Sequence, residues 1–338
     1  MKIFLKQLDL PLRHPFTLGN GSSRTHTPIS LIYLEHDGIV GIGEAAMPPY
    51  LGENHESARE FVNQLDLSFL TFPINFEVLH QYLDRVAGGN TAIKAAVDIA
   101  LYDWWGKKAG KSVTEILGLK NQPVPITAGT IGITPIQQIE AKIKELLNFG
   151  FQKVKVKLGG PVDKESILEI RRFTDLPMTV DVNQGWTDLI EAVKFSFWLA
   201  DQGVLLLEQP FLKEELAKLG QLKTKSPIPV IADESCQRLV DIERVAPFVD
   251  GINIKLMKCS GISEALKMTE RAKNLGLITM LGCMTETSCA TYAEMAIASQ
   301  FDLIDVDGPW ILKEQPFLTP ELANGRIVGL NAPGLGIQ

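Results

Sequence analysis

Charged residues close five apolar segments in the middle of this chain, where a buried strand would normally stay apolar. Three of them are carboxylates, Asp181, Glu208 and Asp233, which follow the runs MTV, VLLL and VIA. The intervals between them are 27 and 25 residues, and about one strand plus one helix fits into each. Because a carboxylate at the end of a buried strand is costly unless a cation neutralises it, the spacing predicts three neighbouring carboxylates around a cation.

Three carboxylates supply hard oxygen ligands, which suit Mg²⁺ and leave coordination positions open for water or for a substrate carboxylate. We therefore expect one Mg²⁺ per subunit, held by Asp181, Glu208 and Asp233. The alternative is that each acid caps the helix that follows its strand. That alternative explains a single acid well, but it does not explain three at the same position of successive units.

Lysines occupy the two remaining segments. Lys155 and Lys157 alternate with valine in KVKVK, and Lys255 lies in INIKLMK, 22 residues after Asp233. Residues two apart on a strand share a face at about 6.7 Å, and at an effective dielectric of about 20 two such charges repel by roughly 2.5 kcal/mol. With Mg²⁺ nearby, this repulsion makes a lysine base near neutral pH plausible. A solvated lysine face on an edge strand is the competing interpretation.

The placement of the lysines on different strands suggests a reaction. Lys255 belongs to the sixth predicted strand of the repeating region and lies across from the second, which carries Lys155 and Lys157. A substrate carbon between them would lose a proton from one face and regain one on the other. This geometry describes a racemase or epimerase that acts next to a carboxylate, with Mg²⁺ stabilising the negative charge that develops.

Strand and helix patterns alternate from Val124 onward, and such alternation predicts a closed (β/α) barrel, whose active site lies at the carboxyl ends of its strands. The competing architecture is a doubly wound open sheet, but the glycine-rich phosphate fingerprint typical of it is absent. The eight predicted strands are 124–132, 153–158, 178–183, 204–209, 230–233, 251–256, 278–282 and 303–306. Among the predicted helices are 136–148 and 262–274.

The first part of the chain has a different organisation. Three strands are predicted at 2–12, 27–37 and 38–45, with a Gly/Ser-rich loop at 17–26, and helices at 56–65, 76–86 and 90–108. This pattern indicates an α+β domain that covers the barrel. We expect a capping domain at 1–120, the barrel at 121–310, and a segment at 311–338 that returns to the capping domain.

Composition narrows the class of protein. The chain has 338 residues, is 45% hydrophobic and 22% charged, and carries a formal net charge of −7 without a basic tract, so a globular protein that binds neither nucleic acid nor membrane is expected. All five histidines lie within the first 80 residues, and the four cysteines form no CxxC pair. Lysines and carboxylates must therefore carry the chemistry. We expect a cytoplasmic homo-oligomer that acts on a small molecule.

Seven segments in order resemble the muconate-lactonizing subgroup of the enolase superfamily: AAVDIALYDWWGK, GFQKVKVKLGG, VDVNQGW, LLLEQPF, IADES, INIKLMKCSGI and PGLGIQ. The resemblance implies a capping domain and a modified (β/α)₇β barrel of the TIM type. It also implies a reaction that passes through an enediolate intermediate, and roles for the residues of the site. These are Asp181, Glu208 and Asp233 as Mg²⁺ ligands, Lys157 and Lys255 as the two bases, Lys155 as the residue that tunes Lys157 and touches the substrate carboxylate, and Asn183 and Glu234 as neighbours of the ligands.

Two further segments resemble dipeptide epimerases of that subgroup. LGCMTETS matches the end of their seventh strand and places Met284 and Thr285 at the substrate. DVDGP supplies Asp305 and Asp307, and two carboxylates on one face would attract the α-ammonium of a dipeptide. Capping of the following turn is the alternative for this pair. The resemblance also implies, from its position on the first barrel strand, that Thr130 contacts substrate.

The identity of the dipeptide stays open at this point. L-Ala-D/L-Glu epimerases use an arginine of the capping loop to pair with the glutamate side chain, and Arg24 lies in roughly that place. An inward Arg24 predicts glutamate as the second residue, and an outward one predicts an apolar residue. The alternative within the family is an o-succinylbenzoate synthase or N-acylamino acid racemase, which binds no free amine. The further alternatives are a muconate cycloisomerase, whose substrate also has no free amine, a Schiff-base lyase, which needs a single lysine, and a non-catalytic binding protein.

Overall fold

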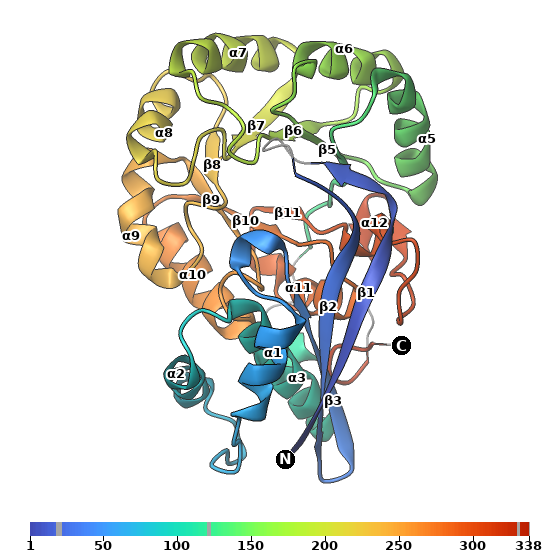
Figure 1. The fold of residues 1–338 in the computed structure, drawn as a ribbon, viewed down its shortest axis with the longest axis vertical. Helices are drawn as coiled ribbons and strands as arrows, with labels where there is room; N and C mark the ends of the chain where they lie inside the picture. The colour runs from blue at the N-terminus through green and yellow to red at the C-terminus, as the bar shows by residue number, and fades with distance from the viewer. Residues whose placement is uncertain (18–21, 120–122, 330–331, 338) are drawn as a thin grey trace.

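The computed structural model describes residues 1–17, 22–119, 123–329 and 332–337. Figure 1 shows two parts: a ring of strands surrounded by helices in the upper part of the view, and the N-terminal hairpin with its helices below it. Among the described residues, no helix is both long enough and apolar enough to cross a membrane.

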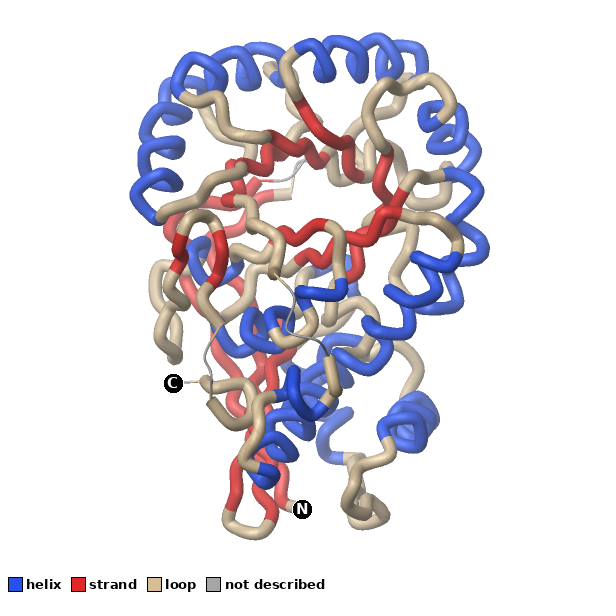
Figure 2. The backbone as a smooth tube through the Cα atoms, turned by 180° about the vertical axis from the view of Figure 1, so that it is seen from behind, coloured by secondary structure: helices blue, strands red, loops and turns tan. Residues whose placement is uncertain are grey.

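The larger part is a barrel of eight parallel strands, and in Figure 2 these strands form a ring inside a layer of helices. The strands pair in chain order from β4 to β11. Seven helices follow the first seven strands, so the predicted (β/α)₇β fold is confirmed. The strands are β4 Gly129–Ile131, β5 Val154–Lys157, β6 Met178–Asp181, β7 Val204–Glu208, β8 Val230–Ala232, β9 Gly251–Ile254, β10 Ile278–Gly282 and β11 Leu303–Asp305. The helices are α5 Ile139–Phe149, α6 Asp163–Phe173, α7 Leu189–Asp201, α8 Leu216–Lys223, α9 Ile242–Val245, α10 Ile262–Asn274 and α11 Ser288–Met295, and a short α12 Gly308–Ile311 follows β11.

The seam between the first and the last barrel strand is closed by side chains. In the described chain β4 and β11 share no ladder pairing. Instead, the hydroxyl of Thr127 donates to the carbonyl of Val306 at 3.1 Å and accepts from the Val306 amide at 2.8 Å. The amide of Thr130 donates to Asp307 Oδ2 at 2.6 Å. These bonds replace the missing ladder, because buried amides need partners.

The smaller part is an antiparallel sheet packed on a central helix. Its strands are β1 Lys2–Thr17, β2 Ser23–His36 and β3 Ile39–Ala46, and its helices are α1 His55–Asn63, α2 Phe76–Val86, α3 Thr91–Ala109 and α4 Val113–Ile116. Helix α3 lies close against β3, where a Cβ at Gly41 would be 2.1 Å from the Ala100 carbonyl and one at Gly43 would be 1.9 Å from that of Ala96. Only glycine permits this approach, which explains why α3 is buried almost throughout.

The loop predicted at residues 17–26 is wrong at both of its ends, because Thr17 belongs to β1 and residues 23–26 belong to β2. The hairpin of β1 and β2 continues to the pairs Phe16↔Arg24 and Thr17↔Ser23, after a register shift that begins at Pro11. The hydroxyl of Thr17 donates to Ser23 Oγ at 2.9 Å, so side chains support the pairing. Residues 18–21 lie outside the described residues. Arg24 therefore sits on a strand, which fixes the direction of its side chain.

The C-terminal segment runs over both parts of the molecule. A short hairpin of β12 Leu322–Ala323 and β13 Arg326–Ile327 lies against the barrel, where the Thr127 amide donates to the Gly325 carbonyl at 2.8 Å. Further along, the Val113 amide donates to the Gly334 carbonyl at 3.0 Å, and the Leu335 amide donates to Asp103 Oδ1 at 2.8 Å. The end of the chain thus packs on α3 and α4 of the capping part.

A buried carboxylate of the capping part holds the start of a barrel helix. Asp98, on α3, is fully buried and accepts from the Ile262 amide at 2.7 Å, from the Ser263 hydroxyl at 2.7 Å and from His80 Nε2 at 2.8 Å. Gly261 precedes α10 with φ +116°, and a Cβ there would lie 2.4 Å from Asp98 Oδ1. Asp98 therefore acts as an N-cap supplied by the other part of the molecule.

The change Asp98→Ala should lower the free energy of unfolding by about 2–4 kcal/mol, because it removes the cap and leaves buried donors without an acceptor. Urea unfolding followed by circular dichroism measures this. Glu60→Ala, at an exposed position of α1, is the control and should change stability by less than about 0.5 kcal/mol. If the two changes lowered the free energy of unfolding equally, Asp98 would not be a residue that joins the capping part to the barrel.

Candidate active site

The three predicted ligand carboxylates lie together at the carboxyl end of the barrel. Asp181 ends β6, Glu208 ends β7 and Asp233 follows β8 directly, and all three are buried. One oxygen of each lies within 4.8 Å of the others. Adjacent parallel strands bring their ends to the same edge, which is why residues separated by 27 and 25 positions meet. The structure places these three residues where the sequence predicted them.

The electrostatics of the three carboxylates fit a divalent cation. Burial and the charge of Asp181 raise the pKa of Glu208 to about 7. Burial also opposes the ionisation of Asp181, but Lys157 and Lys155 lower its pKa to about 2. Glu208 Oε2 is buried and is ion-paired with Lys155 Nζ at 2.8 Å. Three carboxylates whose oxygens lie this close together are the hard donor set that Mg²⁺ prefers.

The lysines of β5 point into the barrel mouth, as the alternation predicted. Lys155 Nζ lies 2.5 Å from Asp305 Oδ2 and 3.1 Å from Asp181 Oδ2, and Lys157 Nζ lies 2.7 Å from the same Asp181 oxygen. Burial disfavours the charge of Lys155, but Asp305, Glu208 and Asp181 together hold its pKa well above the usual range. Around Lys155 the carboxylates therefore outweigh the expected repulsion between lysines.

Lys255 follows β9 and approaches the same cavity from the other side. In the order of strands, β9 is four positions from β5, so the two lie opposite each other in a ring of eight. Lys255 Nζ lies 2.8 Å from Asp233 Oδ2. Asp233 outweighs burial and holds the pKa of Lys255 well above its usual range. Lys157 and Lys255 both line one cavity of about 410 Å³.

Two neighbours of the ligands occupy the positions expected for them. The Asn183 amide donates to Asp181 Oδ1 at 2.9 Å, and its Nδ2 donates to Glu234 Oε1 at 3.3 Å. Burial raises the pKa of Glu234 to about 8, and the adjacent charge of Asp233 adds to the shift. Asn183 and Glu234 both line the cavity, so they border substrate space as well as the ligands.

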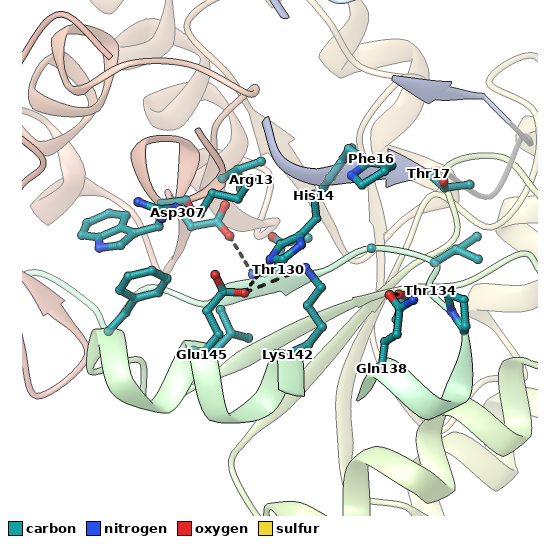
Figure 3. A pocket seen from close by; sticks show the side chains of 18 residues that line it. Arg13, His14, Phe16, Thr17, Thr130, Thr134, Gln138, Lys142, Glu145 and Asp307 are labelled. Carbon is teal, nitrogen blue, oxygen red and sulfur yellow. Dashed lines mark hydrogen bonds and ion pairs between the residues drawn. The ribbon is translucent and has the colours of Figure 1, made fainter. Parts of the chain in front are cut away.

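Asp305, which ends β11, and Asp307, which follows it, differ in their contacts. Asp305 Oδ2 is paired with Lys155, while its Oδ1 is buried without a hydrogen-bond partner among the described residues. Asp307 accepts from the Thr130 amide, and burial together with Asp305 raises its pKa to about 6. Thr130 and both aspartates line the cavity. Figure 3 shows the hydrogen bond between the Thr130 amide and Asp307. The residues drawn there line a second cavity of about 310 Å³, which lies between the end of β1, α5 and α12.

The wall formed by the capping part centres on Arg24, whose side chain points inward. Arg24 Nη2 donates to Thr285 Oγ1 at 2.7 Å, and its Nη1 is buried without a hydrogen-bond partner among the described residues. Burial lowers the pKa of Arg24, but no carboxylate is paired with it among the described residues. Met284 and Thr285 lie beside it in the cavity wall, as predicted.

Sequence reasoning missed four residues that support this site. Tyr50 lines the cavity, and its hydroxyl donates to Met284 Sδ at 3.4 Å. Lys258 is fully buried and donates to Asp233 Oδ1 at 2.6 Å. Asn253 donates to Glu208 Oε1 at 2.8 Å, and Gln209 Oε1 accepts from the Asp233 amide at 2.9 Å. The segments EQP and INIKLMK contained the last three, as polar residues inside otherwise apolar strand ends.

Comparison with known proteins agrees with this geometry. Residues 2–118 match the family model described as the N-terminal domain of mandelate racemase / muconate lactonizing enzyme, and residues 138–338 match the model described as enolase C-terminal domain-like. The chain belongs to the enolase superfamily. The predicted resemblance is thereby confirmed.

Individual relatives within the superfamily are similar over their full length. The chain is 43% identical to L-Ala-D/L-Glu epimerase of Bacteroides thetaiotaomicron, over 100% of this chain and 88% of the relative. Among solved structures, N-succinyl Arg/Lys racemase of Bacillus cereus is 28% identical with a TM-score of 0.91, over 99% of this chain and 94% of that one. A dipeptide epimerase of Enterococcus faecalis, solved with Mg and L-Leu-L-Tyr, is 30% identical with a TM-score of 0.90, over 99% and 98%.

Binding of Mg²⁺ should depend on pH in a defined way. The pKa of Glu208 is raised to about 7, so below pH 7 the metal must displace a proton, and affinity should fall about tenfold per pH unit. Calorimetric titration in two buffers of different ionisation enthalpy should show release of about one proton at pH 6 and almost none above pH 8. Glu208→Gln should weaken binding and remove the dependence. An affinity that is constant between pH 6 and pH 8 would refute the assignment of Glu208.

Proposed function

We propose that this chain is a Mg²⁺-dependent dipeptide epimerase that inverts the α-carbon of the second residue of an L-Ala-X dipeptide, with X acidic. One observation carries the proposal. One cavity has Lys157 and Lys255 in its wall, Asp233 of the carboxylate cluster beside them, and Arg24 and Asp305, each with one polar atom that has no hydrogen-bond partner among the described residues. Each group matches one part of such a substrate.

Asp181, Glu208 and Asp233 would hold the metal. When bound, Mg²⁺ supplies positive charge that stabilises the charge developing on the substrate carboxylate during proton removal. Lys155 lies between these ligands and Asp305, so its ammonium group is positioned to bind the same carboxylate. The buried ammonium needs no reorganisation to do so, because three carboxylates already hold it in place.

Lys157 and Lys255 would transfer the proton. The lysine on one face accepts the α-hydrogen as a neutral amine, and the lysine on the other face donates a proton as an ammonium. The α-carbon is thereby inverted and the protonation states of the two lysines are exchanged. The reverse reaction, or proton exchange with water, restores them. Pairing with Asp181 and Asp233 keeps both side chains directed at the cavity.

The free amine of the dipeptide would bind at Asp305 and Asp307. The buried Oδ1 of Asp305 lacks a hydrogen-bond donor, and an ammonium group supplies one at low cost. This feature favours a dipeptide over the alternatives in the family, o-succinylbenzoate synthesis and racemisation of N-acylamino acids. The acyl group of those substrates has no proton for Asp305, and a succinyl carboxylate would be repelled.

Arg24 supports an acidic second residue over an apolar one. Arg24 is half-buried and lines the cavity, and its Nη1 is buried without a hydrogen-bond partner among the described residues. A buried donor without an acceptor is costly, and a carboxylate from the substrate compensates for that cost. An apolar side chain would leave Nη1 without an acceptor.

We further propose that the protein works in the cytoplasm as a homo-oligomer, with domain limits at residues 120 and 310.

Proton transfer by two bases predicts opposite phenotypes for two variants. In D₂O with Mg²⁺, Lys255→Ala should exchange the α-hydrogen of one epimer of the dipeptide, Lys157→Ala should exchange that of the other, and epimerisation should fall by about 10³-fold or more in both. Mass spectrometry of L-Ala-L-Glu and L-Ala-D-Glu measures the exchange. Lys194→Ala, on the exposed side of α7, should behave like the wild type. Equal loss of exchange from both epimers would refute the assignment.

The role of Arg24 predicts a change of preference. Arg24→Leu should lower kcat/KM for L-Ala-L-Glu by about 100-fold, since a charged hydrogen bond contributes about 2–3 kcal/mol. The value for L-Ala-L-Leu should stay within about threefold or rise. Coupled assays with both dipeptides measure this, with Arg172→Leu, an exposed arginine of α6, as the control. If the wild type prefers L-Ala-L-Leu, the apolar alternative is correct.

A further inference from the structure

The thiol of Cys283 lies beside Asp307 in the wall of the active-site cavity. Cys283 directly follows β10, is half-buried and lines this cavity. All four cysteines lie in the described part of the chain, and the other three, Cys236, Cys259 and Cys289, are buried away from both cavities. Cys283 is therefore the cysteine whose contacts bear on the substrate.

The backbone ladder between β10 and β11 ends at Cys283. Gly282 is paired with Asp305, and the Cys283 amide continues the ladder by donating to the Asp305 carbonyl at 3.1 Å. Because the bonds of a parallel ladder are evenly spaced, the next one would join the Asp307 amide to the Cys283 carbonyl. The Asp307 amide donates instead to Cys283 Sγ at 3.4 Å. A side chain thus replaces the backbone acceptor where the ladder stops.

The same sulfur also bonds to the side chain of Asp307. Cys283 Sγ donates to Asp307 Oδ1 at 3.7 Å. Burial and the charge of Asp307 raise the pKa of the Cys283 thiol well above its usual range, so the thiol keeps the proton that it donates. The Thr130 amide donates to the other oxygen, Asp307 Oδ2, at 2.6 Å. The Asp307 carboxylate is thus held from both sides, by β4 and by the residue after β10.

These two bonds leave room for a substrate amine. A carboxylate offers about four lone-pair positions, and Thr130 and Cys283 each donate to one oxygen of Asp307. An ammonium group can use the remaining positions only if the carboxylate faces it, because a hydrogen bond weakens steeply when its angle is poor. Of the two donors that set this orientation, the Thr130 amide belongs to the backbone and the thiol to a side chain.

We propose that Cys283 is a positioning residue for recognition of the substrate amine: its thiol ties the backbone and the carboxylate of Asp307 to the end of β10, and so directs the carboxylate at the ammonium group. This inference rests on the proposed binding of a dipeptide at Asp305 and Asp307. Cys283 acts through Asp307 and takes no part in the proton transfer. Its loss should therefore raise KM and leave kcat largely preserved.

A role in packing is the alternative, since a buried cysteine also behaves as a small apolar residue. Packing needs only a side chain of similar size, whereas the contacts with Asp307 need a group that both accepts and donates. Three variants separate the two roles. Cys283→Ala removes the thiol, Cys283→Val replaces its volume without a polar atom, and Cys283→Ser supplies a hydroxyl that both donates and accepts.

Two ligands that differ only in the amine test the proposal. L-Ala-L-Glu carries the ammonium group, and propionyl-L-Glu has a hydrogen in its place. Cys283→Ala and Cys283→Val should each weaken binding of L-Ala-L-Glu by about threefold to tenfold, the effect of one hydrogen bond, and change that of propionyl-L-Glu by less than about twofold. Calorimetric titration in the presence of Mg²⁺ measures both. Cys283→Ser should recover most of the loss.

A mutant cycle with Asp307→Asn shows whether the effect passes through Asp307. Asparagine keeps an oxygen for the Thr130 amide but lacks the charge that attracts the amine. In that background Cys283→Ala should change binding of L-Ala-L-Glu by less than about twofold, because the orientation that it disturbs no longer serves the amine. Equal losses in both backgrounds would overturn the proposal. A loss with alanine but not with valine, or a fall in kcat as large as the rise in KM, would indicate packing instead.

The wild type separates this inference from the proposed function. If it binds L-Ala-L-Glu no more tightly than propionyl-L-Glu, Asp305 and Asp307 do not bind an amine and both proposals fail. If it prefers L-Ala-L-Glu and the alanine and valine variants of Cys283 keep the full preference, the proposed function stands and only the role of Cys283 fails.

Infrared spectroscopy tests the contact without any ligand. The difference spectrum of wild type minus C283A isolates the S–H stretch of Cys283. In the Asp307→Asn background this band should move to higher frequency, because a neutral amide oxygen is a weaker acceptor than a carboxylate. A band at the same frequency in both backgrounds would refute the bond between the thiol and Asp307.

Discussion

The balance of buried charge at the mouth of the barrel is the constraint on which the rest of the structure depends. Asp181, Glu208 and Asp233 are fully buried, and four lysines reach them from β5 and from the segment after β9. Lys258 shows the principle most clearly, because it is buried among three carbonyls and Asp233 and has no other role than to hold them. Buried charges this close together are stable only when each one has an oppositely charged or hydrogen-bonding partner. The strands that carry them must therefore end in register.

The two parts of the molecule divide the work. Barrel strands supply the metal ligands and the lysines, and the long hairpin of the capping part supplies Arg24 and Thr27. The parts are joined by carboxylates that cap helices across the interface, Asp98 for α10 and Glu44 for α11. Because these bonds are buried and charged, they fix the hairpin relative to the barrel more firmly than apolar packing alone. Substrate selection can thus reside on a different element from the chemistry.

The barrel and the metal-binding carboxylates could be predicted from the sequence because the patterns that indicate them lie within short segments of the chain. A carboxylate that closes an apolar run is visible without knowledge of the fold, and helices α2 and α10 match their predicted limits. The first barrel strand was predicted at 124–132 but covers only Gly129–Ile131, since Thr127 bonds to β11 and the C-terminal hairpin instead of to β5. The extension of the hairpin to Arg24 also depends on pairs between distant residues. Tyr50 carries no pattern of its own, because only its tertiary contact with Met284 reveals it.

The seam between β4 and β11 has a consequence for the diversification of such enzymes. Asp307 closes that seam by accepting from Thr130 and at the same time faces substrate space. In the proposed function Asp307 also binds the substrate amine, so selection for another substrate would act on a residue that closes the ring. A descendant that abandons amine-bearing substrates cannot simply discard Asp307, because the Thr130 amide would then need another acceptor. Recognition can change more freely at Arg24, whose side chain bonds to the Thr285 hydroxyl, away from this seam.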